Sequence, residues 1–130
     1  GLDDTGIDVL MGIGGAPEAV VTACALKCLG GEIQCKLWPR NQKEREKGEA
    51  DGLDFDKVLT TDDLAMGDDT FFAVTGITDG ALLNGVRYTN KGAKTSSLAM
   101  RAKSGTVRRI ESVHNFEKLT RIAPLKFARP

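Results

Sequence analysis

The sequence predicts an α/β domain, and three features point to that class. The apolar run Ile7–Ile13 is short and nearly continuous and ends at two glycines, as expected of a strand buried on both faces. A helix-like pattern occupies Pro17–Leu29, and Glu32–Trp38 follows as a second strand candidate. Strand, helix and strand in this order predict a parallel βαβ crossover, and the second half of the chain is richer in strands.

The signals at both ends of the predicted helix agree with this assignment. Pro17 suits the first helical turn, and a carboxylate at Glu18 is favourable beside the positive end of the helix dipole. Apolar side chains recur at helical spacings until Gly30 and Gly31, which are expected to end the helix.

Two polar segments follow in the first half. The charged run Arg40–Gly52 has no apolar periodicity and is predicted to be a solvated helix or loop without chemistry. In "TTDDLAM", Thr60 or Thr61 followed by Asp62 and Asp63 is typical of a helix N-terminus. Adjacent carboxylates would also suit a metal, but neighbouring residues diverge on a helix, so we favour the cap.

The second half contains four strand candidates: Thr70–Thr75, Val86–Tyr88, Thr95–Arg101 and Thr106–Val113. No repeat or linker divides the chain, so residues 1–130 are expected to form one domain. Adjacent Arg108 and Arg109 point to opposite faces of a regular strand, so they cannot both face one ligand, and we assign them no role.

Composition excludes several partners. Lys plus Arg and Asp plus Glu both number 18, so no net field attracts nucleic acid or anionic lipid. No apolar stretch is long enough to span a bilayer, and no signal peptide is recognisable. The chain begins "GLDDTG" without Met, so we expect a processed chain or a piece of a longer one.

Cys24, Cys28 and Cys35 are an odd number of thiols with no CxxC pair, which argues against zinc. We interpret them as reduced and mostly buried, with a redox switch as the alternative. His114 is the one histidine, and we expect it to hydrogen-bond structurally rather than act as a base.

The glycine-rich segment "GIGGAPE" before the helix can bring backbone N–H groups close to an anion such as phosphate. It has neither a Walker GK[ST] motif nor a full GxGxxG motif, so it does not identify a nucleotide as the ligand. Glu18 would repel phosphate unless a cation lies between them. From the residues alone, Glu18 is either a charge at the helix end, which we favour, or a metal ligand.

The segments "IDVLMGIGGAPEAVVTACALKCLGGEIQCKLWP", "TTDDL", "VTGITDG" and "SGTVRRIESVH" together resemble the C-terminal part of class II fructose-1,6-bisphosphatases. The likeness is to the cyanobacterial type that also accepts sedoheptulose 1,7-bisphosphate, and it extends to about His114. It implies the C-terminal α/β part of the inositol monophosphatase-like sugar phosphatase fold. It also implies a cytoplasmic, commonly homotetrameric enzyme dependent on Mg²⁺ or Mn²⁺.

The family's GGAPE motif carries a substrate-contacting glycine and a metal-binding glutamate, which fall on Gly15 and Glu18 in this sequence. The resemblance implies that a metal-activated water attacks the 1-phosphate of the sugar bisphosphate. The family's other acidic ligands, its catalytic threonine and its Asp-Gly-Asp motif precede GGAPE and are not in this sequence. No catalytic residue is therefore assigned, and the segment alone is expected to be inactive.

Two alternatives stay open at this point. One is a non-catalytic α/β module that holds a phosphate ligand with "GIGGAP". The other is a part of a larger assembly whose strand-rich second half provides subunit contacts. Sequence upstream of Gly1 would separate an enzyme segment, preceded by the acidic motifs, from a self-contained module.

Overall fold

The computed structural model describes residues 6 and 8–123 of the chain. They fall into two compact units. The first comprises the described residues up to Phe71 together with Arg101–Gly105, and the second comprises Phe72–Met100 together with the described residues from Thr106 onward.

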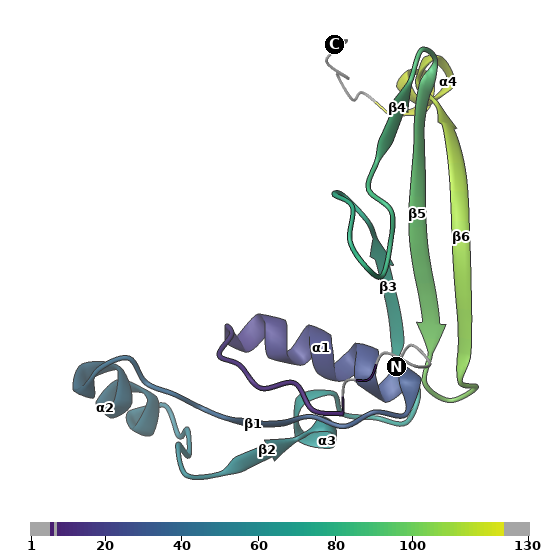
Figure 1. Ribbon diagram of the computed structural model, residues 1–130. Coiled ribbons are helices and arrows are strands. Elements are labelled where there is room, and N and C mark those ends of the chain that lie inside the picture. Colours follow the sequence, from purple (N-terminus) through teal and green to yellow (C-terminus); the bar gives the residue numbers. More distant parts are fainter. Residues whose placement is uncertain (1–5, 7, 124–130) are drawn as a thin grey trace. The chain divides into compact units, whose positions relative to one another are not determined.

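The first unit combines helices with a small sheet (Figure 1). Its elements are α1 (Ala16–Leu29), β1 (Gln34–Lys36), α2 (Gln42–Ala50), β2 (Val58–Thr60) and α3 (Thr61–Leu64). Strands β1 and β2 pair antiparallel, with Cys35 opposite Leu59. Helix α1 packs against α3. Lys27 strengthens this contact by donating to Asp62 Oδ1 at 2.7 Å and to the Ala65 carbonyl at 2.9 Å.

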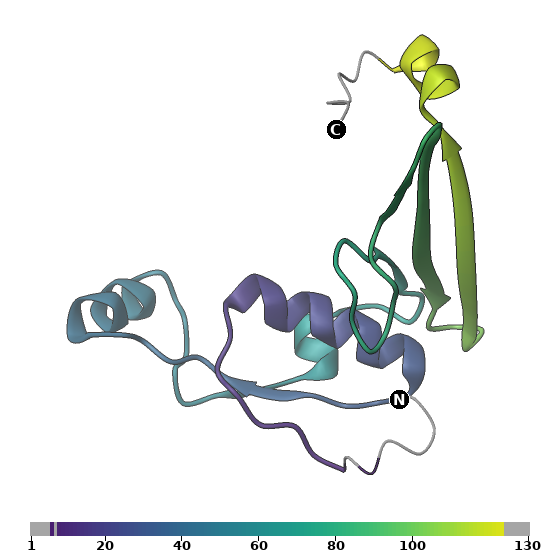
Figure 2. The ribbon, with the colours of Figure 1, turned by 45° about the horizontal axis from the view of Figure 1, so that its top comes forward.

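The second unit is built on a four-stranded sheet and one helix. Its elements are β3 (Phe71–Thr75), β4 (Arg87–Thr89), β5 (Gly92–Arg101), β6 (Thr106–Asn115) and α4 (Phe116–Ile122), except that the first residue of β3 and the last residue of β5 belong to the first unit. Strand β5 pairs with β3, β4 and β6, and β4 runs antiparallel to it with Tyr88 opposite Ala93. Strands β5 and β6 form a long hairpin (Figures 1 and 2). Gly105 allows its turn because it adopts a φ of 60°, which is unfavourable for other residues.

The buried apolar side chains form a small core in each unit. In the first unit they are Ala23, Cys28, Phe55 and Ala65, and in the second Leu83, Ala93, Leu98 and Met100. None of the helices in the described residues is long and apolar enough to cross a membrane.

The predicted strand Ile7–Ile13 is wrong for the part that the structure describes. Residue 7 lies outside the described residues, and residues 8–13 form no strand. They run as irregular chain into α1 (dark purple in Figures 1 and 2), with Val9 74% and Ile13 94% exposed. An apolar run is buried as a strand only where a neighbouring strand pairs with it, and none of the described strands does.

The parallel βαβ crossover is wrong for the same reason. The second predicted strand, Glu32–Trp38, forms only as the short β1, and β1 pairs antiparallel with β2. The chain still combines helices and sheets, so the broader α/β class holds.

Most other elements are confirmed. Helix α1 begins within two residues of Pro17 and ends at Gly30, whose φ is 73°. The charged run forms α2, and the four strand candidates of the second half correspond to β3, β4, β5 and β6.

Candidate functional site

The candidate site is the N-terminus of α1. Gly15 is the N-cap, with an extended backbone and no side-chain cap, and its carbonyl accepts the first helical hydrogen bond from Ala19 N–H at 3.1 Å. Pro17 lies in the first turn, where its missing N–H costs nothing. The backbone N–H groups of this first turn have no acceptor within the helix, so they can bind an anion.

Glu18 lies directly against Gly15. A Cβ built on Gly15 would overlap the Glu18 carboxylate oxygen Oε2. One helical turn therefore brings together the two residues to which the sequence assigned a site role. Both are exposed. The arrangement places a carboxylate beside the positive end of a helix, where it is electrostatically favourable.

Glu18 offers a hard oxygen donor of the kind that Mg²⁺ and Mn²⁺ prefer. Within the described residues, however, no group of three or more His, Cys, Asp or Glu side chains is placed to hold a metal ion. The described residues therefore do not contain a complete ligand set, and Glu18 is a single candidate donor.

The aspartates near α3 are engaged in structural contacts. Thr60 caps α3: its hydroxyl accepts from Asp63 N–H at 3.3 Å, while Asp63 Oδ2 accepts from Thr60 N–H at 2.9 Å. Asp62 pairs with Lys27 at 2.7 Å. The predicted helix cap is confirmed, with Thr60 as the capping residue.

The pKa values of two aspartates reflect these partners. Hydrogen bonds from Lys57 and from the backbone and hydroxyl of Thr60 hold the pKa of Asp63 well below its usual range. The guanidinium of Arg101 lowers the pKa of Asp69 in the same way. Both carboxylates are thus stabilised in their charged forms by groups of the fold itself.

The cysteines are free thiols, as predicted, but only one of them is buried. Cys28 is buried, and its thiol donates to the Thr70 carbonyl at 3.4 Å. Cys24 and Cys35 are half-buried.

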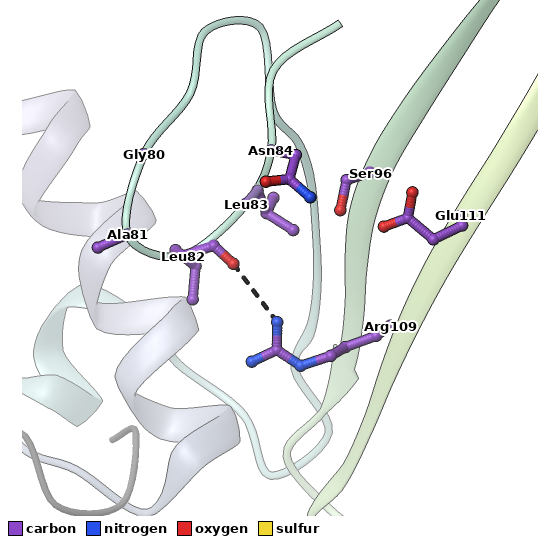
Figure 3. A pocket seen from close by; sticks show the side chains of 8 residues that line it. All are labelled: Gly80, Ala81, Leu82, Leu83, Asn84, Ser96, Arg109 and Glu111. Carbon is purple, nitrogen blue, oxygen red and sulfur yellow. Dashed lines mark hydrogen bonds between the residues drawn. The ribbon is translucent and has the colours of Figure 1, made fainter. Parts of the chain in front are cut away.

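The second unit contains a small pocket that the sequence did not predict (Figure 3). It has a volume of about 150 Å³ and lies between the loop Gly80–Asn84 and strands β5 and β6. Arg109 extends toward the loop and donates to the Leu82 carbonyl at 3.4 Å, and Glu111 and Ser96 also line it. Its residues are far apart in the sequence, so no spacing pattern could reveal it.

His114 has the structural role expected of it. Its Nε2 lies 2.9 Å from the hydroxyl of Thr95 across the β5–β6 hairpin. Arg108 does not line the pocket that Arg109 lines.

Comparison with known proteins shows the family. The family of bacterial fructose-1,6-bisphosphatase, glpX-encoded, matches residues 1–114, and the chain belongs to this family. The chain is 42% identical over 127 residues to D-fructose 1,6-bisphosphatase class 2/sedoheptulose 1,7-bisphosphatase of Synechococcus sp. (strain JA-2-3B'a(2-13)). It is 38% identical over 134 residues to fructose-1,6-bisphosphatase class 2 of Haemophilus influenzae.

These alignments cover 88% and 93% of this chain but only 37% and 40% of the two relatives. The chain thus spans well under half the length of these curated relatives.

Proposed function

We propose that this chain is the C-terminal α/β part of a metal-dependent sugar bisphosphatase with the inositol monophosphatase-like fold. Its substrate is fructose 1,6-bisphosphate, with sedoheptulose 1,7-bisphosphate as a second substrate, and the reaction removes the 1-phosphate. The observation that carries the proposal is the contact between Glu18 and Gly15 at an exposed helix N-terminus, in a chain that belongs to this family. The names of the two relatives support the choice of substrates.

Each site residue has one role in this proposal. Glu18 supplies a carboxylate ligand to Mg²⁺ or Mn²⁺, and the backbone N–H of Gly15 contacts the substrate. When bound, the metal supplies positive charge to the phosphate and lowers the pKa of a bound water. The N-terminus of α1 orients its N–H groups toward the anion and adds about half a positive charge there.

The pairing of Glu18 with a phosphate site needs the cation for an electrostatic reason. A carboxylate and a phosphate at one helix end repel each other, and a divalent ion held by the Glu18 carboxylate would offset that repulsion. Gly15 contributes by its lack of a side chain, because a Cβ would occupy the space of the Glu18 carboxylate.

The exposed apolar surface of the first unit supports the proposal that residues 1–130 belong to a longer polypeptide. Leu10 and Met11 are exposed, and α1 carries exposed Val20 and Val21 although Ala23 and Cys28 on the same helix are buried. A helix that is apolar on several faces is normally enclosed by further structure. We therefore place residues 1–130 as one C-terminal domain of a larger chain, whose remaining part covers this surface and contributes the other metal ligands. Like the enzymes it resembles, the native protein is proposed to act in the cytoplasm as a homo-oligomer.

The test is phosphate release by the native protein. Fructose 1,6-bisphosphate is incubated with Mg²⁺ or Mn²⁺, and product is assayed as fructose 6-phosphate and inorganic phosphate, with an excess of chelator as the control. Release that stops with chelator and returns with added metal is the expected result. Tight binding of the bisphosphate without phosphate release would instead favour a non-catalytic binding module.

A further inference from the structure

Strand β6 lies at an edge of the sheet and is long for an edge strand. It has ten residues, and within the described part of the chain its one partner is β5 (Figure 1). It contains no proline, which would block pairing. A regular edge of this length presents a row of backbone donors and acceptors to another strand.

The backbone groups that point to this open edge can be identified. Phe116, directly after β6, donates its N–H to the Lys91 carbonyl beside β5. A Cβ on Gly92 of β5 would overlap the His114 carbonyl oxygen, so the backbone of His114 also faces β5. Because backbone groups alternate in direction along a strand, even-numbered residues face β5 and odd-numbered residues face the open edge.

The side chains of β6 are complementary to themselves in one antiparallel register. We propose that β6 pairs with β6 of a second copy of this chain about a two-fold axis at Ile110. In that register Arg109 lies opposite Glu111 of the second copy, and Val107 lies opposite Val113. Each of these two pairs occurs twice by symmetry, and Ile110 faces its own equivalent on the axis.

The direction of the backbone groups fits this register. Arg109 and Glu111 are odd-numbered, so they exchange hydrogen bonds with each other across the interface. Ile110 is even-numbered, so it forms the intervening non-hydrogen-bonded pair, in which Cα atoms are only about 4.5 Å apart. Val113 is 78% and Ile110 41% exposed in the single chain, so pairing removes apolar surface from water.

Charge selects this register over its neighbours. If the second strand slides by two residues in one direction, Arg109 lies opposite Arg109 of the other copy. If it slides by two residues in the other direction, Glu111 lies opposite Glu111. Like charges directly opposite each other in an antiparallel pair are destabilising, whereas opposite charges stabilise it. This self-complementarity is the reason why we assign the edge to a second copy and not to the remaining part of a longer chain.

The first experiment measures self-association of the native protein by sedimentation. Glu111→Arg is expected to raise the dissociation constant of the β6-mediated contact at least tenfold. The charge swap Arg109→Glu/Glu111→Arg is expected to restore it to within about threefold of the original value. Lys94→Glu, a charge reversal on β5 away from the open edge, is the matched control and leaves association unchanged.

The second experiment tests the axis directly. Ile110→Cys should form an intermolecular disulfide under mild oxidation, identified by mass spectrometry as a cross-link between two copies of the peptide that contains residue 110. Ser112→Cys is the control. In the proposed register its two cysteines are offset along the strands by four residues, or about 13 Å, which is too far for a disulfide. A monomeric native protein would overturn the proposal. An oligomer that neither responds to Glu111→Arg nor cross-links at residue 110 would also overturn it, because another segment then covers the edge.

Discussion

The carboxylate of Glu18 occupies the space in which a side chain on Gly15 would begin. Two residues three apart in the sequence are thereby interdependent: the absence of a Cβ on the first sets the position of the carboxylate of the second. Gly15 needs no unusual backbone conformation, since its φ is −73°. The requirement for glycine at this position is one of space.

This relationship predicts different results for two neighbouring glycines. Gly15→Ala should displace the Glu18 carboxylate and lower the phosphatase activity of the native protein by about tenfold or more, equivalent to about 1.4 kcal/mol of lost transition-state stabilisation. Gly14→Ala is the matched control, because a Cβ there meets no atom within 4 Å in this structure. Activity and thermal melting are measured for both. Equal activity in the two variants would show that the Glu18–Gly15 contact has no functional role.

In helix α2, helix propensity and side-chain packing predict opposite effects of Gly48→Ala on stability. Alanine in a helix is favoured over glycine by about 1 kcal/mol, so Gly48→Ala would stabilise α2 if space allowed. A Cβ at Gly48 would lie 2.5 Å from Cζ and 2.8 Å from Cε2 of the buried Phe55 ring. Overpacking of this kind costs about 1–3 kcal/mol, so we expect a net loss of stability in urea unfolding.

The double variant Gly48→Ala/Phe55→Leu checks the cause of that loss. A smaller side chain at residue 55 makes room for the methyl group, so Gly48→Ala should be less harmful in this background than in the wild type. An equal loss in both backgrounds would mean that the ring of Phe55 is not what opposes the substitution.

The cap of α3 predicts a local stability effect. Thr60→Ala removes the hydroxyl that accepts from Asp63 N–H, and the loss of an N-cap of this type costs about 1 kcal/mol. Thr22→Ala, on an exposed position of α1, is the control and should change the free energy of unfolding by less than about 0.5 kcal/mol. Comparable losses for the two threonines would argue against the cap.

Acid should destabilise the fold through Asp63 and Asp69. Their pKa values are lowered in the folded chain from the ordinary value of 3.8, by Lys57 and Thr60 in one case and by Arg101 in the other. A carboxyl group whose pKa is lower in the folded chain than in the unfolded chain stabilises the fold at pH values above its unfolded-state pKa. This stabilisation is lost as the pH falls through the folded-state pKa. The free energy of unfolding is therefore expected to decline below about pH 4.

Asp63→Asn should flatten this decline, because an amide cannot be protonated in that range. Asp68→Asn, a substitution at an exposed aspartate, is the matched control. Urea midpoints are compared between about pH 2 and pH 7. A slope unchanged by Asp63→Asn would assign the acid sensitivity to other carboxylates.

Local signals predicted those parts of the fold that depend on nearby residues. Pro17 and Gly30 bound α1 as expected, and α2 forms with ion pairs at i,i+4 spacing such as Arg45–Glu49. Burial along β5 alternates over much of its length, with Ser96, Leu98 and Met100 on its buried face. In each case the determining contacts lie within the element or one turn away from it.

Pairing partners could not be predicted in the same way. An apolar run such as Val9–Ile13 indicates that burial is favourable, but it does not identify the strand that must lie beside it. The parallel crossover was inferred from element order, whereas β1 pairs with β2, more than 20 residues further along the chain. The Gly15–Glu18 contact was accessible to sequence reasoning because one helical turn makes it, while the pocket of the second unit joins residues from three distant segments.

The most direct test of the account is a metal titration of the native protein with Glu18→Gln. Glutamine keeps the size and the hydrogen-bonding oxygen but removes the negative charge. The exposed Glu32, just beyond the other end of α1, gives the matched control Glu32→Gln. Fructose-bisphosphatase activity is measured against Mg²⁺ and Mn²⁺ concentration, with thermal melts of all three proteins. We predict that Glu18→Gln raises the metal requirement steeply and lowers kcat by orders of magnitude while the fold survives, and that Glu32→Gln behaves as the wild type. A well-folded Glu18→Gln protein with unchanged activity and metal dependence would contradict the account and leave Glu18 as a charge that stabilises the helix by about 0.3–1 kcal/mol.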